Sequence, residues 1–369
     1  MRCYLCVSFQ ALTVLQQYFL TLYITLRHKE SVGVVMSNLC GQWSNSTAGL
    51  DLQKVAMPNF IFAVMQLLFS LLISTSNGLV IASICVFRRL RTLTNSLLAS
   101  LAMSDLIVAF ITIPLYVSFY LTPESLLCDR LACLAWFGSV ILGCGSSLLN
   151  LLVIVLDRFV AIHFPLSYMK HQTPRTVGAV LAALWVYILA LSALPLMGWN
   201  HWVDDEPCNF YTTLPKAYVI WAAYLTVGTC IVSSSLLYAK IFATVRRHQR
   251  RIHAQNIAGR VESRHLDGEM KSTRLNATVF LLFVLFWSPY FCVGPLKYSS
   301  LSQEVVEIIK NGCLVLAFGN SMVNPVVYGL MQKKFSAAYR ILLTTPCTRW
   351  AGLSGHILVR EDGDPCLSG

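Results

Sequence analysis

Seven long apolar stretches run along the chain, and short polar segments separate them. They cover about residues 60–87, 93–120, 129–162, 177–197, 216–245, 272–297 and 305–330. At about 1.5 Å per residue, a helix over each stretch is long enough to cross the roughly 30 Å of hydrocarbon in a membrane. The pattern therefore predicts an all-α membrane protein with a seven-transmembrane helix bundle over residues 58–331.

Basic residues gather in the polar segments that follow alternate apolar stretches. Arg88, Arg89 and Arg91 follow the first stretch, and residues 246–274 are strongly basic. An excess of lysine and arginine is typical of cytoplasmic loops. We therefore expect a multi-pass protein of the plasma membrane, with its N-terminus outside and its C-terminus inside.

Residues 332–369 follow the last apolar stretch and begin with the sequence QKKFSAAYRILL. As a helix, this sequence has apolar and basic residues on opposite faces. The apolar face holds Phe335, Ala338, Ile341 and Leu342, and the other holds Lys333, Lys334 and Arg340. The pattern predicts a short amphipathic helix on the inner membrane surface, followed by a cytoplasmic tail. Cys347 comes next and is either a palmitoylation site or a free thiol.

The segment before the bundle, residues 1–57, is expected to be extracellular. Its residues 4–26 are apolar and fit a signal-like segment, an extra span, or an over-extended start with Met36 or Met57 as the true first residue. The seven-span topology is complete without this stretch, which disfavours an eighth helix. Asn45 begins an Asn-Ser-Thr glycosylation sequon where an outer tail should lie.

Composition excludes several classes of function. Hydrophobic residues make up 56% of the chain and charged residues only 12%, too few charges to cover a soluble protein. The net charge of +11 lies mostly in the interhelical loops, so it does not require nucleic acid as a partner. The thirteen cysteines form no metal pattern. No nucleophile–base set is visible, so we expect neither an enzyme nor a cofactor beyond one bound ion.

Asp105 is an ionisable residue inside the second span, where a lone carboxylate is costly. Amide and hydroxyl side chains at compatible depth are Asn77, Ser147, Asn320, Ser321 and Asn324. One carboxylate with several neutral oxygens suits a small hard cation, so we expect a cation site at Asp105, Ser147, Asn320 and Asn324. A protonated or water-bridged Asp105 is the alternative.

A charged pair, Asp157-Arg158, ends the third apolar stretch. Asp157 can hold Arg158 locally, and Glu269, at the start of the sixth helix, is a second possible partner. An Arg158–Glu269 pair would join the third and sixth helices in one state and release a cation in the other. Such a pair would make a two-state switch.

Two prolines interrupt later spans. Pro289 follows Trp287 in an aromatic cluster, and Pro325 follows Asn324 three residues before Tyr328. A proline inside a helix removes a hydrogen bond and favours a kink. Each is therefore a candidate hinge, although plain aromatic packing explains the first cluster as well. Cys133 and Cys208 face the oxidising side of the membrane, where we expect them to form a disulfide.

These motifs together resemble the rhodopsin-like G-protein-coupled receptors. In order they are Asn77, Leu101 to Asp105, Cys133, Asp157-Arg158-Phe159, Trp185, Cys208, Phe286 to Pro289, and Asn324 to Tyr328. The resemblance implies that Arg158 engages a heterotrimeric G protein when the sixth helix swings out, that Asp105 binds sodium in the inactive state, and that ligand sits above Trp287. Phe159 stands where the family often has tyrosine, and no proline interrupts residues 216–245.

Within the family, the chain is most similar to the bile acid receptors, mainly in the Gly-Trp-Asn-His-Trp stretch at 198–202. This likeness implies a steroid-like, lipophilic ligand and stimulatory coupling to adenylyl cyclase. Trp287, Tyr290 and Tyr224 match contact residues of that group. Four other positions depart from it, namely Phe137, Ile141, Cys144 and Ala222.

The expected ligand pocket is aromatic and apolar, which suits a bile acid, another steroid or a lipid. Its predicted lining is Phe137, Val140, Ile141, Cys144, Phe210, Tyr218, Trp221, Tyr224, Trp287, Tyr290, Phe291 and Phe318. Val140 stands where a biogenic-amine receptor has an aspartate, which disfavours an amine. A receptor for adenosine or another small metabolite is the alternative, favoured by Phe210 and disfavoured by Gly294. A transporter or channel is more remote, because no inverted repeat is visible.

Overall fold

The structure is a computed structural model that describes residues 52–121, 129–204, 208, 210–254, 260–293 and 303–355. Within these residues the chain forms helices and no strands. The long helices are α3 (Leu52–Val86), α4 (Leu93–Ile107), α5 (Ile113–Leu121), α7 (Arg130–His163), α9 (Pro174–Ala193), α12 (Thr226–Ala254), α13 (Arg260–Val293) and α14 (Gln303–Met331). Shorter elements are η1 (Arg88–Leu90), η2 (Val108–Thr112), α8 (Pro165–His171), α10 (Phe210–Thr213), α11 (Lys216–Val219), η3 (Ile220–Leu225), α15 (Lys333–Thr344) and η5 (Cys347–Gly355).

Seven stretches of the described helices are long and apolar enough to span a membrane. They are Ile61–Val86, Leu93–Ser118, Arg130–His163, Pro174–Ala193, Lys216–Arg247, Ser272–Val293 and Ile308–Met331. These bounds agree with the seven predicted spans to within a few residues, so the predicted seven-helix bundle is confirmed. Residues 4–26 and the Asn45 sequon lie outside the described residues.

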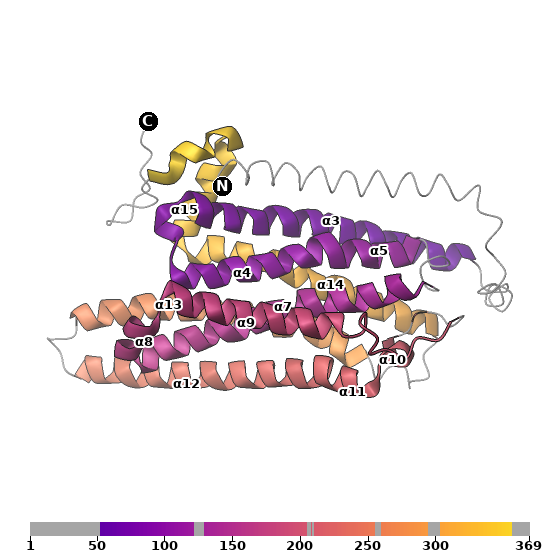
Figure 1. Cartoon of the computed structure of the whole chain (residues 1–369). Helices are drawn as coiled ribbons and strands as arrows, with labels where there is room; N and C mark the ends of the chain where they lie inside the picture. The colour runs from indigo at the N-terminus through magenta and orange to yellow at the C-terminus, as the bar shows by residue number, and fades with distance from the viewer. Residues whose placement is uncertain are drawn as a thin grey trace.

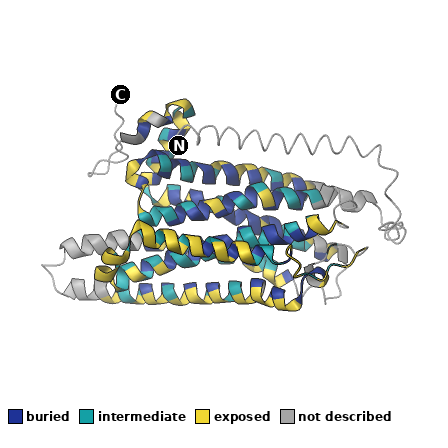
Figure 2. Ribbon diagram, in the orientation of Figure 1, coloured by how far each residue is buried: buried dark blue, intermediate teal, exposed yellow. Residues whose placement is uncertain are grey.

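The spans lie side by side in one bundle with two distinct ends (Figure 1). We call the end that carries the Cys133–Cys208 disulfide, α10 and α11 the disulfide end, and the end that carries Arg158, α8 and α15 the Arg158 end. Figure 2 shows many exposed residues on the outer faces of α9 and α12. Many exposed side chains of the bundle are large and apolar, whereas Asn77 and Asp105 are fully buried. A protein in lipid is expected to have apolar side chains on its outer surface and polar side chains in its interior.

The prolines inside spans leave carbonyls that other side chains satisfy. Pro289 cannot donate to the carbonyl of Leu285, and the hydroxyl of Ser288 donates to it instead at 3.1 Å. Pro325 likewise leaves the carbonyl of Ser321, four residues earlier, without its helical donor. The amide Nδ2 of Asn77, on α3, donates to that carbonyl at 2.9 Å and so ties the first span to the seventh.

Two spans contain a π-helical segment, η2 in the second and η3 in the fifth. No proline accompanies η3. Its wide turn leaves the carbonyl of Trp221 available, and the hydroxyl of Thr226 donates to it at 2.8 Å. The hydroxyl of Tyr187 on α9 lies 3.2 Å from the same Thr226 oxygen. Side-chain hydrogen bonds therefore accompany this distortion in place of a proline.

The predicted amphipathic helix is present as α15, after the seventh span. Phe335, Ala338 and Leu342 are buried, whereas Lys333 and Arg340 on the other face are exposed. The helix packs against α3 and α14 at the Arg158 end (Figure 1). Its position there confirms the fold predicted for the start of the C-terminal segment.

Candidate functional site

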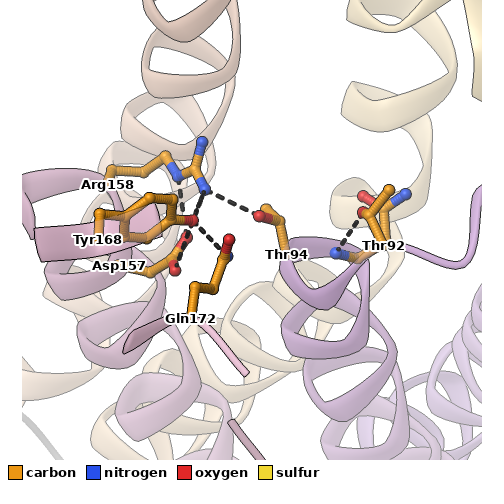
Figure 3. Close-up of polar contacts among 7 residues, drawn as sticks. Thr92, Thr94, Asp157, Arg158, Tyr168 and Gln172 are labelled. Atoms are coloured by element: carbon orange, nitrogen blue, oxygen red, sulfur yellow. Dashed lines mark hydrogen bonds and ion pairs between the residues drawn. The ribbon is translucent and has the colours of Figure 1, made fainter. Parts of the chain in front are cut away.

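Arg158 is held at one end of the bundle by a group of polar side chains (Figure 3). It lies near the end of α7 and is only 4% exposed. Its Nε donates to Asp157 Oδ2 at 3.1 Å, and its Nη2 forms a closer ion pair with the same oxygen. Nη2 also donates to the hydroxyl of Thr94 on α4 at 2.8 Å. The guanidinium is therefore neutralised locally, as the sequence predicted for Asp157.

Tyr168, on the short helix α8, completes this group. Its hydroxyl donates to Asp157 Oδ1 at 3.1 Å and accepts from Arg158 Nη2 at 3.1 Å, and Gln172 Nε2 donates to it as well. Burial raises the pKa of Tyr168 to about 12 because it disfavours the phenolate. Tyr168 therefore stays protonated and able to donate to Asp157 at neutral pH.

The other predicted partner of Arg158, Glu269, lies on α13, and its side chain is outside the described residues. The Arg158–Glu269 pair stays a prediction. Two further tyrosines are buried in the core, Tyr238 on α12 and Tyr328 on α14. Their hydroxyls are buried and have no hydrogen-bond partner in the part of the chain that the structure describes. Unpaired buried hydroxyls are costly, so each is suited to gain a partner in another conformation.

Asp105 lies in the centre of the bundle and is fully buried. Its Oδ1 accepts from the hydroxyl of Ser147 at 3.2 Å, and its Oδ2 accepts from Asn324 Nδ2 at 2.9 Å. The side-chain oxygen of Asn320 is buried and has no hydrogen-bond partner within the described ranges. The structure therefore brings Ser147 and Asn324 onto Asp105 and leaves one neutral oxygen unpaired in the predicted cation site.

A small internal cavity of about 10 Å³ lies between this polar group and the aromatic cluster of α13. It is lined by Val108, Cys144, Ser147, Phe283, Trp287, Ala317, Phe318, Asn320 and Ser321. Its lining thus joins an apolar wall to polar side chains of the predicted cation site. This volume is far below the roughly 300–1,000 Å³ of typical small-molecule pockets, so a steroid-sized ligand requires the helices to move apart.

Some predicted lining residues face this cavity and others do not. Cys144, Trp287 and Phe318 line it. Tyr290 and Phe291 pack against the Trp287 ring, with centroids 6.0 and 6.2 Å away.

Nearer the disulfide end, Phe137 packs 4.9 Å from the Trp136 ring, and Val140 and Ile141 are half-buried. Tyr224 is 60% exposed and does not line the cavity.

Two more of the predicted lining residues, Tyr218 and Trp221, are not part of the cavity wall. Trp221 is exposed like Tyr224, and the Phe210 side chain is outside the described residues. Tyr218 is fully buried, and its hydroxyl donates to the carbonyl of Leu191 at 2.9 Å. That carbonyl lies four residues before Pro195 and lacks its helical donor for the same reason as the carbonyl of Ser321. Tyr218 therefore links α11 to α9 and supports the bundle.

The predicted disulfide is present between Cys133 on α7 and Cys208, with Cα atoms 5.7 Å apart. It fixes the segment before α10 to the third span, beside a buried cluster that includes Phe137 and Tyr218. Cys347 also takes part in a disulfide. Its palmitoylation stays a prediction, and acylation would require the reduced thiol.

Seven spans, a buried carboxylate at their centre and a restrained arginine at one end define a polytopic membrane protein of the receptor class. The sequence profile described as "7 transmembrane receptor (rhodopsin family)" matches residues 76–328. The chain therefore belongs to the rhodopsin family of G-protein-coupled receptors. This family consists of receptors rather than enzymes, which agrees with the expectation from the motifs.

Individual relatives have several different names. The Probable G-protein coupled receptor No18 of Amphibalanus amphitrite is 29% identical over 361 residues, covering 81% of this chain and 93% of that protein. The Histamine H2 receptor of Canis lupus familiaris is 30% identical over 283 residues, covering 72% and 74%. The Adenosine receptor A3 of Bos taurus is 26% identical over 310 residues, covering 81% and 92%. The closer likeness to bile acid receptors stays a prediction.

Proposed function

We propose that this receptor binds a lipophilic ligand, a bile acid or another steroid or lipid, in its helix bundle. The ligand enters from outside the cell at the disulfide end and presses on Trp287. The Arg158 end then opens on the cytoplasmic side of the plasma membrane, and Arg158 engages a G protein that stimulates adenylyl cyclase. The observation that carries this proposal is the set of contacts that restrains Arg158. Three side chains hold the arginine in one stable state, and its release from them would define a second, active state.

The lining of the cavity supports a lipophilic ligand. Val108, Phe283 and Phe318 supply apolar surface, and the polar side chains lie on the Asp105 side. Val140 supplies no carboxylate to pair with an amine. Two named relatives are receptors for histamine and adenosine, so these two compounds are the competing ligands to test.

The surface beside Arg158 supports a protein partner. On and next to α8, Phe164, Leu166 and Met169 are 56%, 85% and 80% exposed. They lie beyond the end of the third span, Arg130–His163. Exposed apolar side chains beside a basic switch suit a docking protein rather than water.

Sodium at Asp105 is part of the proposal. Ser147, Asn320 and Asn324 would share the ion with the carboxylate, and the unpaired Asn320 oxygen fits this role. The ion would stabilise the restrained state, so added sodium should lower basal nucleotide exchange. In Asp105→Asn this sodium dependence should disappear. An unchanged sodium response in that variant would exclude the site.

The test of the proposed function measures cyclic AMP and nucleotide exchange in cells that express the full chain. The panel holds unconjugated bile acids, neutral steroids, lysophospholipids, adenosine and histamine. We expect a lipophilic agonist to raise cyclic AMP, and Arg158→Ala to abolish this response with unchanged surface expression. A response confined to adenosine or histamine would overturn the ligand class, and normal coupling by Arg158→Ala would overturn the switch.

A further inference from the structure

Gln66, on α3, is an unexplained polar residue away from the Arg158 and Asp105 groups. It is 0% exposed, and among the described residues neither its Oε1 nor its Nε2 has a hydrogen-bond partner. Leaving a buried polar group unpaired is destabilising, because the group loses its hydrogen bonds to water and gains none in the protein. A leucine at this position would avoid the cost, so an uncompensated glutamine points to a partner that arrives from elsewhere.

Two hydrogen bonds fix the level of Gln66 along the bundle. Ser70, one helical turn away on α3, donates to the carbonyl of Ala109 at 2.7 Å, so Gln66 lies toward the disulfide end, beside η2 and α5. Asn77 donates to the Ser321 carbonyl. Gln66 lies 11 residues before Asn77, and Asn311 lies 10 residues before Ser321. At about 1.5 Å per residue, Gln66 and Asn311 therefore lie at the same level. This level is roughly 15 Å nearer the disulfide end than the Asn77–Ser321 hydrogen bond.

Asn311 carries a second neutral polar side chain at this level. It is 6% exposed, and its Oδ1 accepts from the hydroxyl of Tyr116 at 3.0 Å, which joins α14 to α5. The ring of Tyr116 meets the ring of Phe318 edge-on at 5.9 Å. Phe318 lines the internal cavity. One aromatic layer therefore separates the cavity from the level of Gln66 and Asn311.

We propose that Gln66, Asn311 and Tyr116 form a hydrogen-bonding subsite for a neutral polar group of the ligand. The inference rests on the proposed function, because it assigns one end of the lipophilic ligand that the bundle would bind. The recognised group is a hydroxyl, carbonyl or amide: the three side chains carry no formal charge, and a buried ion would need a countercharge. The subsite gives Gln66 the partner it lacks, and the apolar body of the ligand lies over Phe318 and Trp287.

The experiment uses the purified full-length receptor in lipid nanodiscs. The probes are two matched pairs that each differ by one hydroxyl: 3α-hydroxy-5β-pregnan-20-one with 5β-pregnan-20-one, and lithocholic acid with 5β-cholanic acid. Their dissociation constants are measured for the wild type and for Gln66→Leu. Ser70→Ala is the matched control, since it lies on the same helix, one turn away, and its hydroxyl already has a partner.

In one or both pairs, we expect the wild type to bind the hydroxylated member about tenfold more tightly, the effect of one net hydrogen bond. Gln66→Leu should reduce this ratio to below about twofold, whereas Ser70→Ala should keep it. The ligand-free Gln66→Leu receptor should also melt at a higher temperature, because it lacks the unpaired amide.

Equal ratios in the wild type and Gln66→Leu would overturn the subsite. The subsite would also be overturned if Gln66→Leu melted at a lower temperature and still preferred the hydroxylated probes. The Gln66 amide would then bind only a resident water molecule. Failure of every probe to bind the wild type would instead overturn the lipophilic ligand class itself, and the subsite with it.

Discussion

Replacing Tyr168 by phenylalanine removes a single hydroxyl from the group that restrains Arg158. That hydroxyl donates to Asp157 at 3.1 Å and accepts from Arg158 at 3.1 Å. The ring, and hence its packing on α8, is retained. Asp157 would still pair with Arg158 directly, so the restraint is weakened and not abolished. Tyr168→Phe should therefore raise the activity of the receptor without ligand.

The size of the effect follows from the two contacts with charged groups. A hydrogen bond to a charged group contributes about 1.5–3 kcal/mol. Tyr168 is half-buried, and water replaces part of what is lost, so we expect about 1–2 kcal/mol. Since about 1.4 kcal/mol is a factor of ten, the ratio of released to restrained Arg158 should rise about 5- to 30-fold. A basal population of about 1% would then reach roughly 5–25%.

The assay is ligand-free nucleotide exchange on a panel of G proteins, normalised to receptor at the cell surface. Tyr187→Phe is the control, because it removes a tyrosine hydroxyl that bonds far from Arg158. The raised pKa of Tyr168, about 12, means that the folded protein holds this proton more tightly than the unfolded chain does. That stabilisation is full below about pH 10 and is lost as the pH rises toward 12. The increase in ligand-free nucleotide exchange caused by Tyr168→Phe should thus be constant between about pH 6 and 9. Unchanged basal exchange in Tyr168→Phe would refute the restraint.

Three other predictions concern thermal stability and expression. Asn77→Ala should lower Tm, because the Ser321 carbonyl loses its donor at a cost of about 1–3 kcal/mol. In the double variant with Pro325→Ala, the new backbone N–H at position 325 can donate to that carbonyl, so the loss of stability should be smaller. Strictly additive effects of the two substitutions would contradict this. Gly138→Ala should lower Tm because its Cβ would meet a carbonyl of α9 at 2.8 Å, whereas Gly178→Ala, with nothing within 4 Å, should not; equal shifts would argue against the close approach. Cys133→Ser should reduce surface expression, since removing a native disulfide costs about 2–5 kcal/mol; wild-type expression would show the bond to be dispensable.

The bundle could be predicted from the sequence because lipid imposes a length and a composition on each span. The Asp105 contacts with Ser147 and Asn324 could be anticipated for a related reason. A buried carboxylate needs polar partners, and few lie at its depth. The disulfide followed from two cysteines on the same side of the membrane.

Other parts depended on tertiary geometry that no local pattern carries. Tyr168 lies on a short helix outside the spans, and only the fold brings its hydroxyl to Asp157. Gln66 looked like one polar residue in an apolar stretch, and its lack of a partner is visible only in the packed bundle. The π-helix η3 occurs in a span without a proline, and the Thr226 hydroxyl that bonds to its open turn could not be assigned this role from the sequence. Tyr224 was expected at the ligand and is exposed, since a single-residue match does not fix which face of a helix turns inward.

The internal cavity and the Asp105 group share side chains, and this has a consequence for signalling. Ser147, Asn320 and Ser321 line the cavity, and Ser147 also donates to Asp105. A cation bound by Asp105 would draw the oxygens of these side chains toward itself. A ligand that enlarges the cavity would pull the same helices, α7 and α14, apart. Each would therefore weaken the other, and the coupling must be reciprocal: if sodium lowers agonist affinity by some factor, agonist lowers sodium affinity by the same factor.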